Sequence, residues 1–303
     1  KTLGHDMDLT FKPTFFETKS NNNKFILQNE LRKKNKDSSF VTDFALTKNY
    51  KSFTDNKNKD LNHFFLKYNK NLNLSNFSES TLDAKIERVS NDTYLKVFRN
   101  NLFDTPILPN DLNSLTSEIN LNLDHEDYYL STGIRAYENL GTIHSDRYQF
   151  VFPYYDYSRN LSSDKIDGSF SFYSGGSNTL SNTNNLRTSV TNDFQYNSID
   201  YFTDNGFKNR FDLYFKNLNS IGKNDTIYTS KPQIDAMNII SIDTSFPLIK
   251  SNLVSMETLE SLTPKISLRL NPGNNMDNFS SSNKNINANN VFDINRLGIS
   301  DSY

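Results

Sequence analysis

The sequence predicts an all-β protein, an antiparallel meander of about a dozen long strands. Apolar and polar residues alternate with period two over most of the chain, which is the pattern of strands with two different faces. Short tracts rich in Asn, Lys, Asp and Ser separate these runs, as hairpin turns do. Aromatic residues make up 13% of the 303 residues although the hydrophobic share is only 35%, and this ring content argues against disorder.

The first element, residues 6–33, is predicted to form two paired strands. Pro13 lies in the middle of the first strand, although proline cannot donate to a β-ladder and is normally confined to edges, strand starts and bulges. Apolar side chains occupy one face of this strand. Short polar or charged side chains occupy the other face: Asp8, Thr10, Lys12 and Thr14.

Further alternating runs continue along the chain, each predicted to be a strand of about ten residues, above the usual length. In one of them Phe211, Leu213 and Phe215 alternate with Asp212 and other polar neighbours. The runs are 64–74, 81–89, 93–99, 128–137, 148–158, 168–176, 192–202, 210–217 and 264–270.

The connections between these runs are mostly of hairpin length. Two longer loops are predicted at 103–114 and 271–290, the second of them rich in Asn and Ser. Residues 255–262 are the best candidate for a helix, and a short one. No window contains the roughly 18 consecutive apolar residues that a transmembrane helix needs.

The sequence contains no pattern typical of an enzyme. The formal net charge of −2 gives no reason to expect nucleic-acid binding. The chain has no Cys, which excludes thiolate metal sites and disulfides within it. Residues 124–127 (DHED) are the densest His and carboxylate cluster, but neighbouring residues of a strand point to opposite faces, so we interpret them as a charged turn. We therefore expect no catalytic residue, no cofactor and no metal site.

Two architectures fit long alternating strands: a soluble sandwich and a transmembrane barrel, because both produce period two. Three features favour the barrel. The strands are many and long, aromatic residues gather near strand ends, and charged residues occur in mid-strand, where a wet lumen tolerates them. These mid-strand charges are Lys85, Glu87, Arg135, Lys216 and Arg269. Alternation alone leaves both architectures open.

Ordered motifs add a family resemblance. Residues 6–33 carry a proline strand followed by a strand that ends in Asn-Glu-x-Arg, residues 231–265 carry Pro-Gln and then Leu-Thr-Pro-Lys, and residues 290–303 carry Phe-x-x-Asn-Arg. Together they resemble the barrel domain of the LptD (organic solvent tolerance) family of lipopolysaccharide-assembly proteins, in a form similar to its alphaproteobacterial members. The matching residues are Asp8, Pro13, Phe15, Phe16, Asn29, Glu30, Arg32, Pro232, Gln233, Leu262, Pro264 and Lys265.

The resemblance implies part of a Gram-negative outer-membrane translocon that inserts lipopolysaccharide into the outer leaflet without covalent chemistry. In that family an LptE-like lipoprotein plugs the lumen, and an LptA-like jellyroll bridge delivers the lipid from the periplasm. The polar strand faces, with Asp8, Thr10, Lys12 and Thr14, would line the lumen, and the apolar faces would contact outer-membrane lipid. Pro13 matches the proline of the family's second gate strand, where it weakens hydrogen bonding beside the lateral opening.

The family's amino-terminal jellyroll, first barrel strand, last strands and cysteines have no counterpart in these 303 residues. We therefore expect a fragment, a single partial β-barrel domain over residues 1–303 that forms an open, curved sheet with two unpaired edges. Two other interpretations stay open. They are a different outer-membrane barrel, such as a porin or transporter, and a soluble all-β binding protein.

Overall fold

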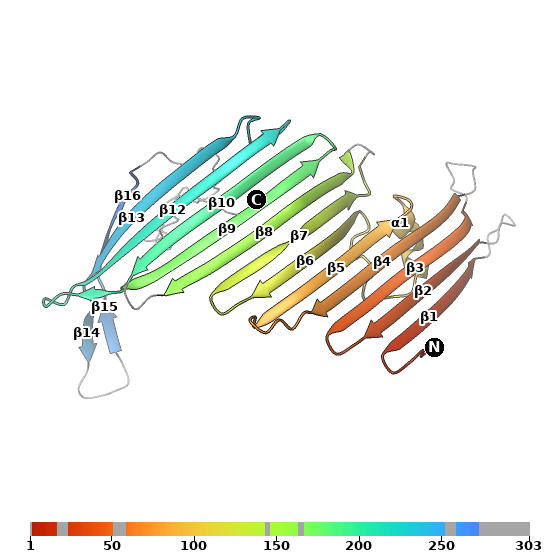
Figure 1. The fold of residues 1–303 in the computed structure, drawn as a ribbon, viewed down its shortest axis with the longest axis horizontal. Coiled ribbons are helices and arrows are strands. Elements are labelled where there is room, and N and C mark those ends of the chain that lie inside the picture. Colours follow the sequence, from red (N-terminus) through yellow and green to blue (C-terminus); the bar gives the residue numbers. More distant parts are fainter. Residues whose placement is uncertain are drawn as a thin grey trace. The chain divides into compact units, whose positions relative to one another are not determined.

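The computed structural model describes residues 2–16, 24–50, 59–142, 146–162, 167–251 and 259–272. Within them a 14-stranded sheet has the strand order β1-β2-β3-β4-β5-β6-β7-β8-β9-β10-β12-β13-β16, with β11 attached to β12 (Figure 1). In this order β1 and β16 stand at opposite ends, so the sheet is not closed. The predicted antiparallel meander is confirmed. The elements are β1 Met7–Phe16, β2 Lys24–Lys34, β3 Ser38–Tyr50, β4 Lys59–Asn71, β5 Glu79–Val89, α1 Tyr94–Phe98, η1 Arg99–Asn101, β6 Ser114–Asp124, β7 Tyr128–Asn139, β8 Tyr148–Ser162, β9 Gly168–Ser181, β10 Asn185–Ser198, β11 Tyr201–Phe202, β12 Lys208–Lys223, β13 Gln233–Ser245, β14 Leu248–Ser251, β15 Leu259–Leu262 and β16 Lys265–Leu270.

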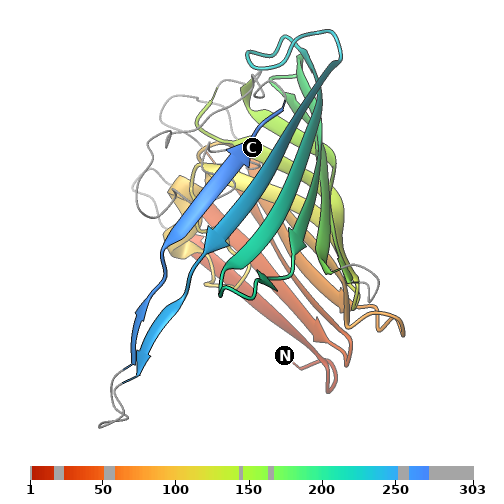
Figure 2. The ribbon, with the colours of Figure 1, turned by 90° about the vertical axis from the view of Figure 1, so that its left-hand side faces the viewer.

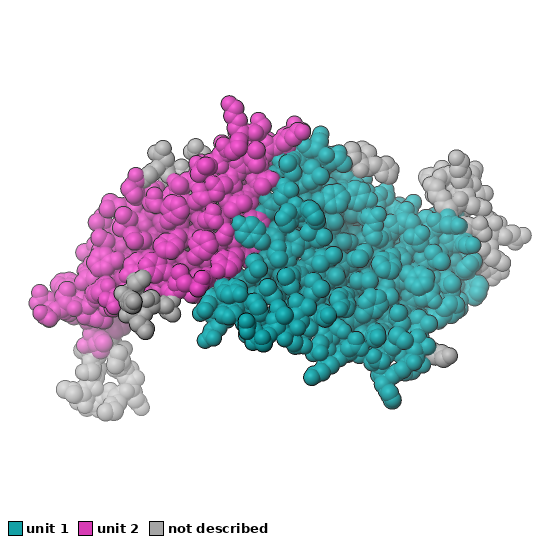
Figure 3. Space-filling view, viewed as in Figure 1, with its two compact units in different colours: residues 1–155, 177–187 teal, residues 156–176, 188–303 magenta. Residues whose placement is uncertain are grey.

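The chain divides into two compact units (Figure 3). Unit 1 comprises residues 1–155 and 177–187, and unit 2 comprises residues 156–176 and 188–303. The prediction of one domain over residues 1–303 stays a prediction.

Tight turns join the strands of unit 1 at one end of the sheet. Between β2 and β3, the amide of Asn35 donates to the carbonyl of Ser38 at 2.8 Å. Between β6 and β7, the amide of His125 donates to the carbonyl of Tyr128 at 2.8 Å. The DHED cluster is therefore a turn, as predicted, because β6 ends at Asp124 and β7 begins at Tyr128.

Period-two alternation gives the sheet of unit 1 two different faces. In β3, Phe44 and Leu46 are exposed, whereas Asp43, Ala45 and Thr47 are buried. Since residues opposite each other on neighbouring strands share a face, the register extends this division across β1 to β7. The apolar face carries Phe11, Phe25, Leu27, Phe44, Leu46, Phe64, Leu66, Ile119 and Ile134. The polar face carries Lys12, Gln28, Glu30, Asp43, His63, Lys85, Glu87, Glu118 and Arg135.

Unit 2 shows the same division in β12 and β13. Phe211 is 42% exposed and its neighbour Asp212 only 7%, and the alternation continues through Lys216, which is buried. Phe211 pairs with Ile242 and Leu213 with Ile240, so the exposed face of these strands is apolar.

One predicted strand is wrong. Residues 93–99 contain the helix α1 followed by η1. Three of their side chains are buried, Tyr94, Leu95 and Phe98, and this spacing places them on one side of a helix rather than on one face of a strand. The loop predicted at 103–114 is confirmed except for its last residue, Ser114, which begins β6.

The helix predicted at 255–262 is wrong in its described part, because Leu259–Leu262 forms β15 and pairs with β14. The backbone groups of this segment form their hydrogen bonds with β14 in a separate two-stranded sheet, instead of within a helix. Of the loop predicted at 271–290, all but residues 271 and 272 lies outside the described residues. Of the helices in the described part of the chain, none has the length and hydrophobicity to cross a membrane.

Candidate functional site

The segment between β5 and β6, residues 90–113, folds over the polar face of β2 to β5 in unit 1, and we call it the cap. In Figure 2 the orange helix of the cap lies to one side of the neighbouring strand ribbons, not within the sheet. The cap and the strands beneath it share one hydrophobic cluster. Its members are Tyr94, Leu95, Phe98, Leu102 and Ile107 from the cap, and Ile26, Ala45, Leu61, Phe65, Val89, Leu115 and Leu140 from outside it.

Buried polar groups attach the cap to the sheet. The amide of Phe103 donates to Oε1 of Gln28 at 2.6 Å, and Nε2 of Gln28 donates to Oδ2 of Asp43 at 2.8 Å. The hydroxyl of Thr105 donates to the same oxygen at 3.3 Å. Because a buried polar group without a partner costs free energy, these bonds fix the position of the cap.

His63 lies at the centre of this interface. Its Nδ1 is 2.9 Å from the hydroxyl of Tyr94, its Nε2 is 3.3 Å from Oδ1 of Asp43, and its ring stacks on Phe65 at 4.3 Å. Burial, together with the negative charge of Asp43, raises the pKa of Tyr94, so the phenol keeps its proton. The side chains of His63 and Asp43 are fully buried, so this arrangement stabilises the cap and offers no access to a substrate.

The cap also reaches the first strand of the sheet. Nζ of Lys12 donates to the carbonyl of Asn101 at 3.2 Å and lies 5.9 Å from the ring centroid of Phe103. Lys12 therefore links β1 to the cap in addition to the ladder that links β1 to β2.

Pro13 does not interrupt β1. The register from Met7 to Phe16 is continuous, with Pro13 opposite Leu27, so the structure contains no bulge there. Asp6 accepts from the amide of Lys34 and so faces β2, whereas the carbonyl of Met7 accepts from Leu3 on the opposite side. The backbone N–H and C=O groups of successive residues point alternately to the two sides of an antiparallel strand. Pro13 is an even number of residues from Met7, so its nitrogen points to the same side as the carbonyl of Met7, away from β2. The missing N–H therefore lies on the outer edge of β1, the first strand in the sheet order.

The four residues predicted to line a lumen share one face. Their partners on β2 belong to the polar face, and Thr10 lies opposite the buried Glu30. The four residues are Asp8, Thr10, Lys12 and Thr14. Asp8 is exposed and the other three are half-buried. That this face lines a lumen stays a prediction.

The predicted mid-strand charges lie on the polar face. Arg269 lies opposite the buried Ser241, and the other four belong to ion pairs. Lys85 contacts Glu87 at 2.7 Å, and Arg135 contacts Glu118 at 3.1 Å while its guanidinium lies 4.3 Å from the ring centroid of Tyr154. In unit 2, Nζ of Lys216 lies 3.4 Å from Oδ2 of Asp193. Pairing of this kind offsets part of the cost of burying a charge.

Within the described ranges, no group of three or more His, Asp or Glu side chains is arranged to hold a metal ion. In the DHED turn, the amide of Asp127 donates to Nδ1 of His125 at 3.1 Å, which is a local turn contact.

The sequence analysis missed the cap, although a signal was present. Ile26, Ala45, Leu61 and Phe65 are apolar residues at positions whose neighbours on the same face are polar. Such an apolar patch within a polar face indicates that another segment covers it.

A comparison with models of known protein families finds no match, and a comparison with curated proteins finds no similar sequence.

Proposed function

We propose that this chain is part of an outer-membrane β-barrel of the LptD type, which inserts lipopolysaccharide into the outer leaflet of a Gram-negative bacterium. The observation that carries the membrane part of the proposal is the polarity of the sheet. Within each unit, charged side chains are buried on one face of the sheet, such as Asp43 in unit 1 and Lys216 in unit 2, while Phe, Leu and Ile are exposed on the other. A soluble sandwich has the reverse arrangement, and a transmembrane barrel has this one.

The topology supports the same proposal. Among the described residues the only other sheet is the two-stranded pair of β14 and β15, so no second large sheet packs against the apolar face. An exposed apolar face of this extent is unfavourable in water and favourable against lipid.

The lipopolysaccharide part of the proposal rests on the motif resemblance. The polar face, with its cations and side-chain amides, would contact sugar and phosphate groups of the lipid as they pass. An LptE-like lipoprotein in the lumen and an LptA-like periplasmic bridge are the partners that such a translocon requires.

Pro13 has a place in this proposal as a weak point of the seam. On the outer edge of β1 it withholds one donor from whichever strand would pair there, which favours parting of that pair. Replacement by Ala restores a donor at this edge and should strengthen the seam.

The test is depletion of the complete protein, followed by complementation with the wild type, with Pro13→Ala, or with Phe11→Leu. Phe11→Leu is the control, because Phe11 is exposed on the apolar face of the same strand and its replacement adds no backbone donor. Lipopolysaccharide at the cell surface should fall on depletion, recover with the wild type and the control, and recover poorly with Pro13→Ala. Unchanged surface lipopolysaccharide on depletion of a protein found in the outer membrane would instead indicate another barrel, such as a porin or transporter. A protein recovered only in the soluble fraction would favour the all-β binding protein.

A further inference from the structure

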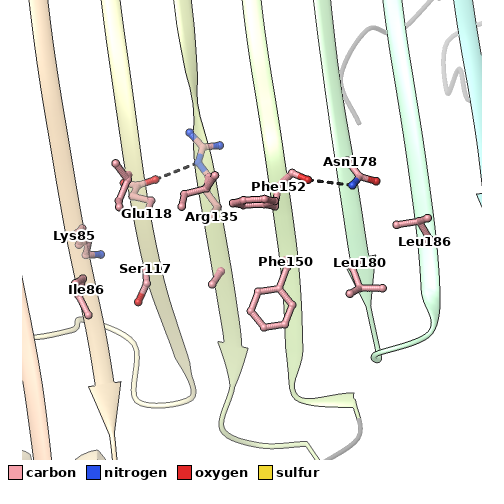
Figure 4. Close-up of a pocket in the computed structure, with 13 residues that line it drawn as sticks. Lys85, Ile86, Ser117, Glu118, Arg135, Phe150, Phe152, Asn178, Leu180 and Leu186 are labelled. Carbon is pink, nitrogen blue, oxygen red and sulfur yellow. Dashed lines mark hydrogen bonds and ion pairs between the residues drawn. The ribbon is translucent and has the colours of Figure 1, made fainter.

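A hollow of about 430 Å³ lies on the apolar face of unit 1 (Figure 4). Side chains from β5 to β10 line it, among them Ile86, Ala136, Phe150, Leu180 and Leu186. Its volume falls within the range of small-molecule sites, about 300–1,000 Å³.

The hollow exists because small side chains lie between large ones. Ser117 lies between Ile86 and Phe150 (Figure 4). Its cross-strand partner Ala136 is also small, so the two leave space among the large side chains. Phe152 is 60% exposed. Apolar walls without partner atoms lose dispersion contacts, which an inserted hydrocarbon chain restores.

The polar atoms around the hollow are already bonded. Nδ2 of Asn178 donates to the carbonyl of Phe152 at 3.0 Å (Figure 4). The side chains of Glu118 and Arg135 belong to the polar face, where they pair with each other, and so offer the hollow no free polar group. A ligand in the hollow therefore needs to be apolar.

A polar cluster follows the hollow on the same face. Side chains two residues apart on a strand share a face, so Arg88 follows Ile86 on β5 and Glu138 follows Ala136 on β7. On β8, Tyr148 precedes Phe150, and the two rings stack at 5.9 Å. The apolar hollow thus ends at a row of charged and hydroxyl groups.

Within this cluster Arg88 is the cation with donors to spare. Arg147 binds Glu138 at 2.6 Å and also pairs with Asp92. Burial lowers the pKa of Arg147, but the two carboxylates outweigh burial, so the net shift of its pKa is upward. The hydroxyl of Tyr148 donates to Glu138 at 3.0 Å. Arg88 reaches Glu138 only at 3.5 Å, and its side chain is 60% exposed.

We propose that the hollow and Arg88 together form a site for one phospholipid, with an acyl chain in the hollow and the headgroup phosphate on the guanidinium of Arg88. The inference rests on the proposed function, because it requires the apolar face to contact lipid. Guanidinium groups bind phosphate in a bidentate geometry, and Arg is common where a membrane protein meets the lipid headgroups. Apolar walls and a cation at one end match the two ends of such a lipid.

The site is tested on the complete protein in detergent, by native mass spectrometry during titration with phosphatidylglycerol and, separately, with diacylglycerol. Ala136→Phe fills the hollow with another apolar group, and Arg88→Gln removes the cation. Ala236→Phe is the matched control, since Ala236 is exposed on the apolar face of β13, outside the hollow. We expect one tightly held phosphatidylglycerol in the wild type and in the control, and at least about tenfold weaker binding in Ala136→Phe.

Arg88→Gln separates the headgroup from the chain. It should weaken phosphatidylglycerol about tenfold and leave diacylglycerol unchanged. Equal binding in the wild type, Ala136→Phe and Arg88→Gln, or an equal loss in Ala236→Phe, overturns the site while leaving the proposed membrane function intact. A complete protein that does not partition into membranes overturns both.

Discussion

Phe98→Ala should release the cap from the polar face. Phe98 is 4% exposed in the cluster beneath the cap and contacts Tyr50 and Tyr94, with ring centroids at 5.5 Å and 5.1 Å. Truncation of a buried Phe to Ala costs about 3–5 kcal/mol. Ala has a higher helix propensity than Phe, which offsets roughly 0.5 kcal/mol of this cost. If the cost falls on the attachment of the cap, its opening equilibrium should rise about 10²–10³-fold.

Hydrogen exchange at the amide of Phe103 measures this opening directly, because that amide donates to the side chain of Gln28 across the interface. Val97→Ala is the matched control, since Val97 is the preceding residue of α1 and is 40% exposed. Exchange in Phe98→Ala should be faster by the stated factor and in Val97→Ala nearly unchanged. Equal exchange in the wild type and Phe98→Ala would refute the reasoning that burial of this ring holds the cap in place.

Three further predictions concern the cap and the sheet of unit 1. Tyr94→Phe removes the hydrogen bond to His63 and should weaken the attachment of the cap by about 1 kcal/mol, seen as faster exchange at Phe103. The pKa of Tyr94 is raised in the folded protein, so the wild-type cap should lose stability as the pH rises above the pKa of about 10 that Tyr has in the unfolded chain. Tyr94→Phe should not show this loss. A wild-type cap whose stability does not change from pH 9 to 11 would argue against a raised pKa of Tyr94. Gly133→Ala would press a Cβ against the carbonyl oxygen of Ile119 and should cost about 1–3 kcal/mol in urea unfolding. Gly4→Ala, whose nearest contact is 3.5 Å, should be nearly neutral, and equal midpoints for the two variants would show that β6 and β7 adjust freely.

The sequence was most informative where strands have two chemically distinct faces. Alternation correctly placed Phe211 and Asp212 on opposite faces of β12, because period two is a property of any strand. It failed at residues 93–99, where an apolar, charged and aromatic mixture over one helical turn also satisfies a short alternating pattern. Local pattern does not reveal whether a segment joins the ladder or packs on its face, and the contacts that decide this, such as Phe103 with Gln28, join residues far apart in the chain.

The same limit applies to Pro13 and to the hollow on the apolar face. Sequence predicted an edge or a bulge for Pro13, and the register was needed to choose the edge and to show which way its nitrogen faces. The hollow depends on Ala136 lying beside Phe150, on strands whose pairing no sequence pattern fixes.

The central claim is that the apolar face contacts lipid and the polar face does not. Nitroxide labels test it most directly when they are placed singly along β12, from residue 210 to residue 216, in the complete protein reconstituted in a bilayer. The 303 residues contain no Cys, and any Cys elsewhere in the complete protein is replaced by Ser before labelling. Collision with oxygen, which concentrates in the lipid interior, should be greatest at positions 211, 213 and 215 and least at positions 212, 214 and 216, with the opposite order for a water-soluble nickel complex. Collision with the nickel complex that is greatest at 211, 213 and 215 would contradict the account.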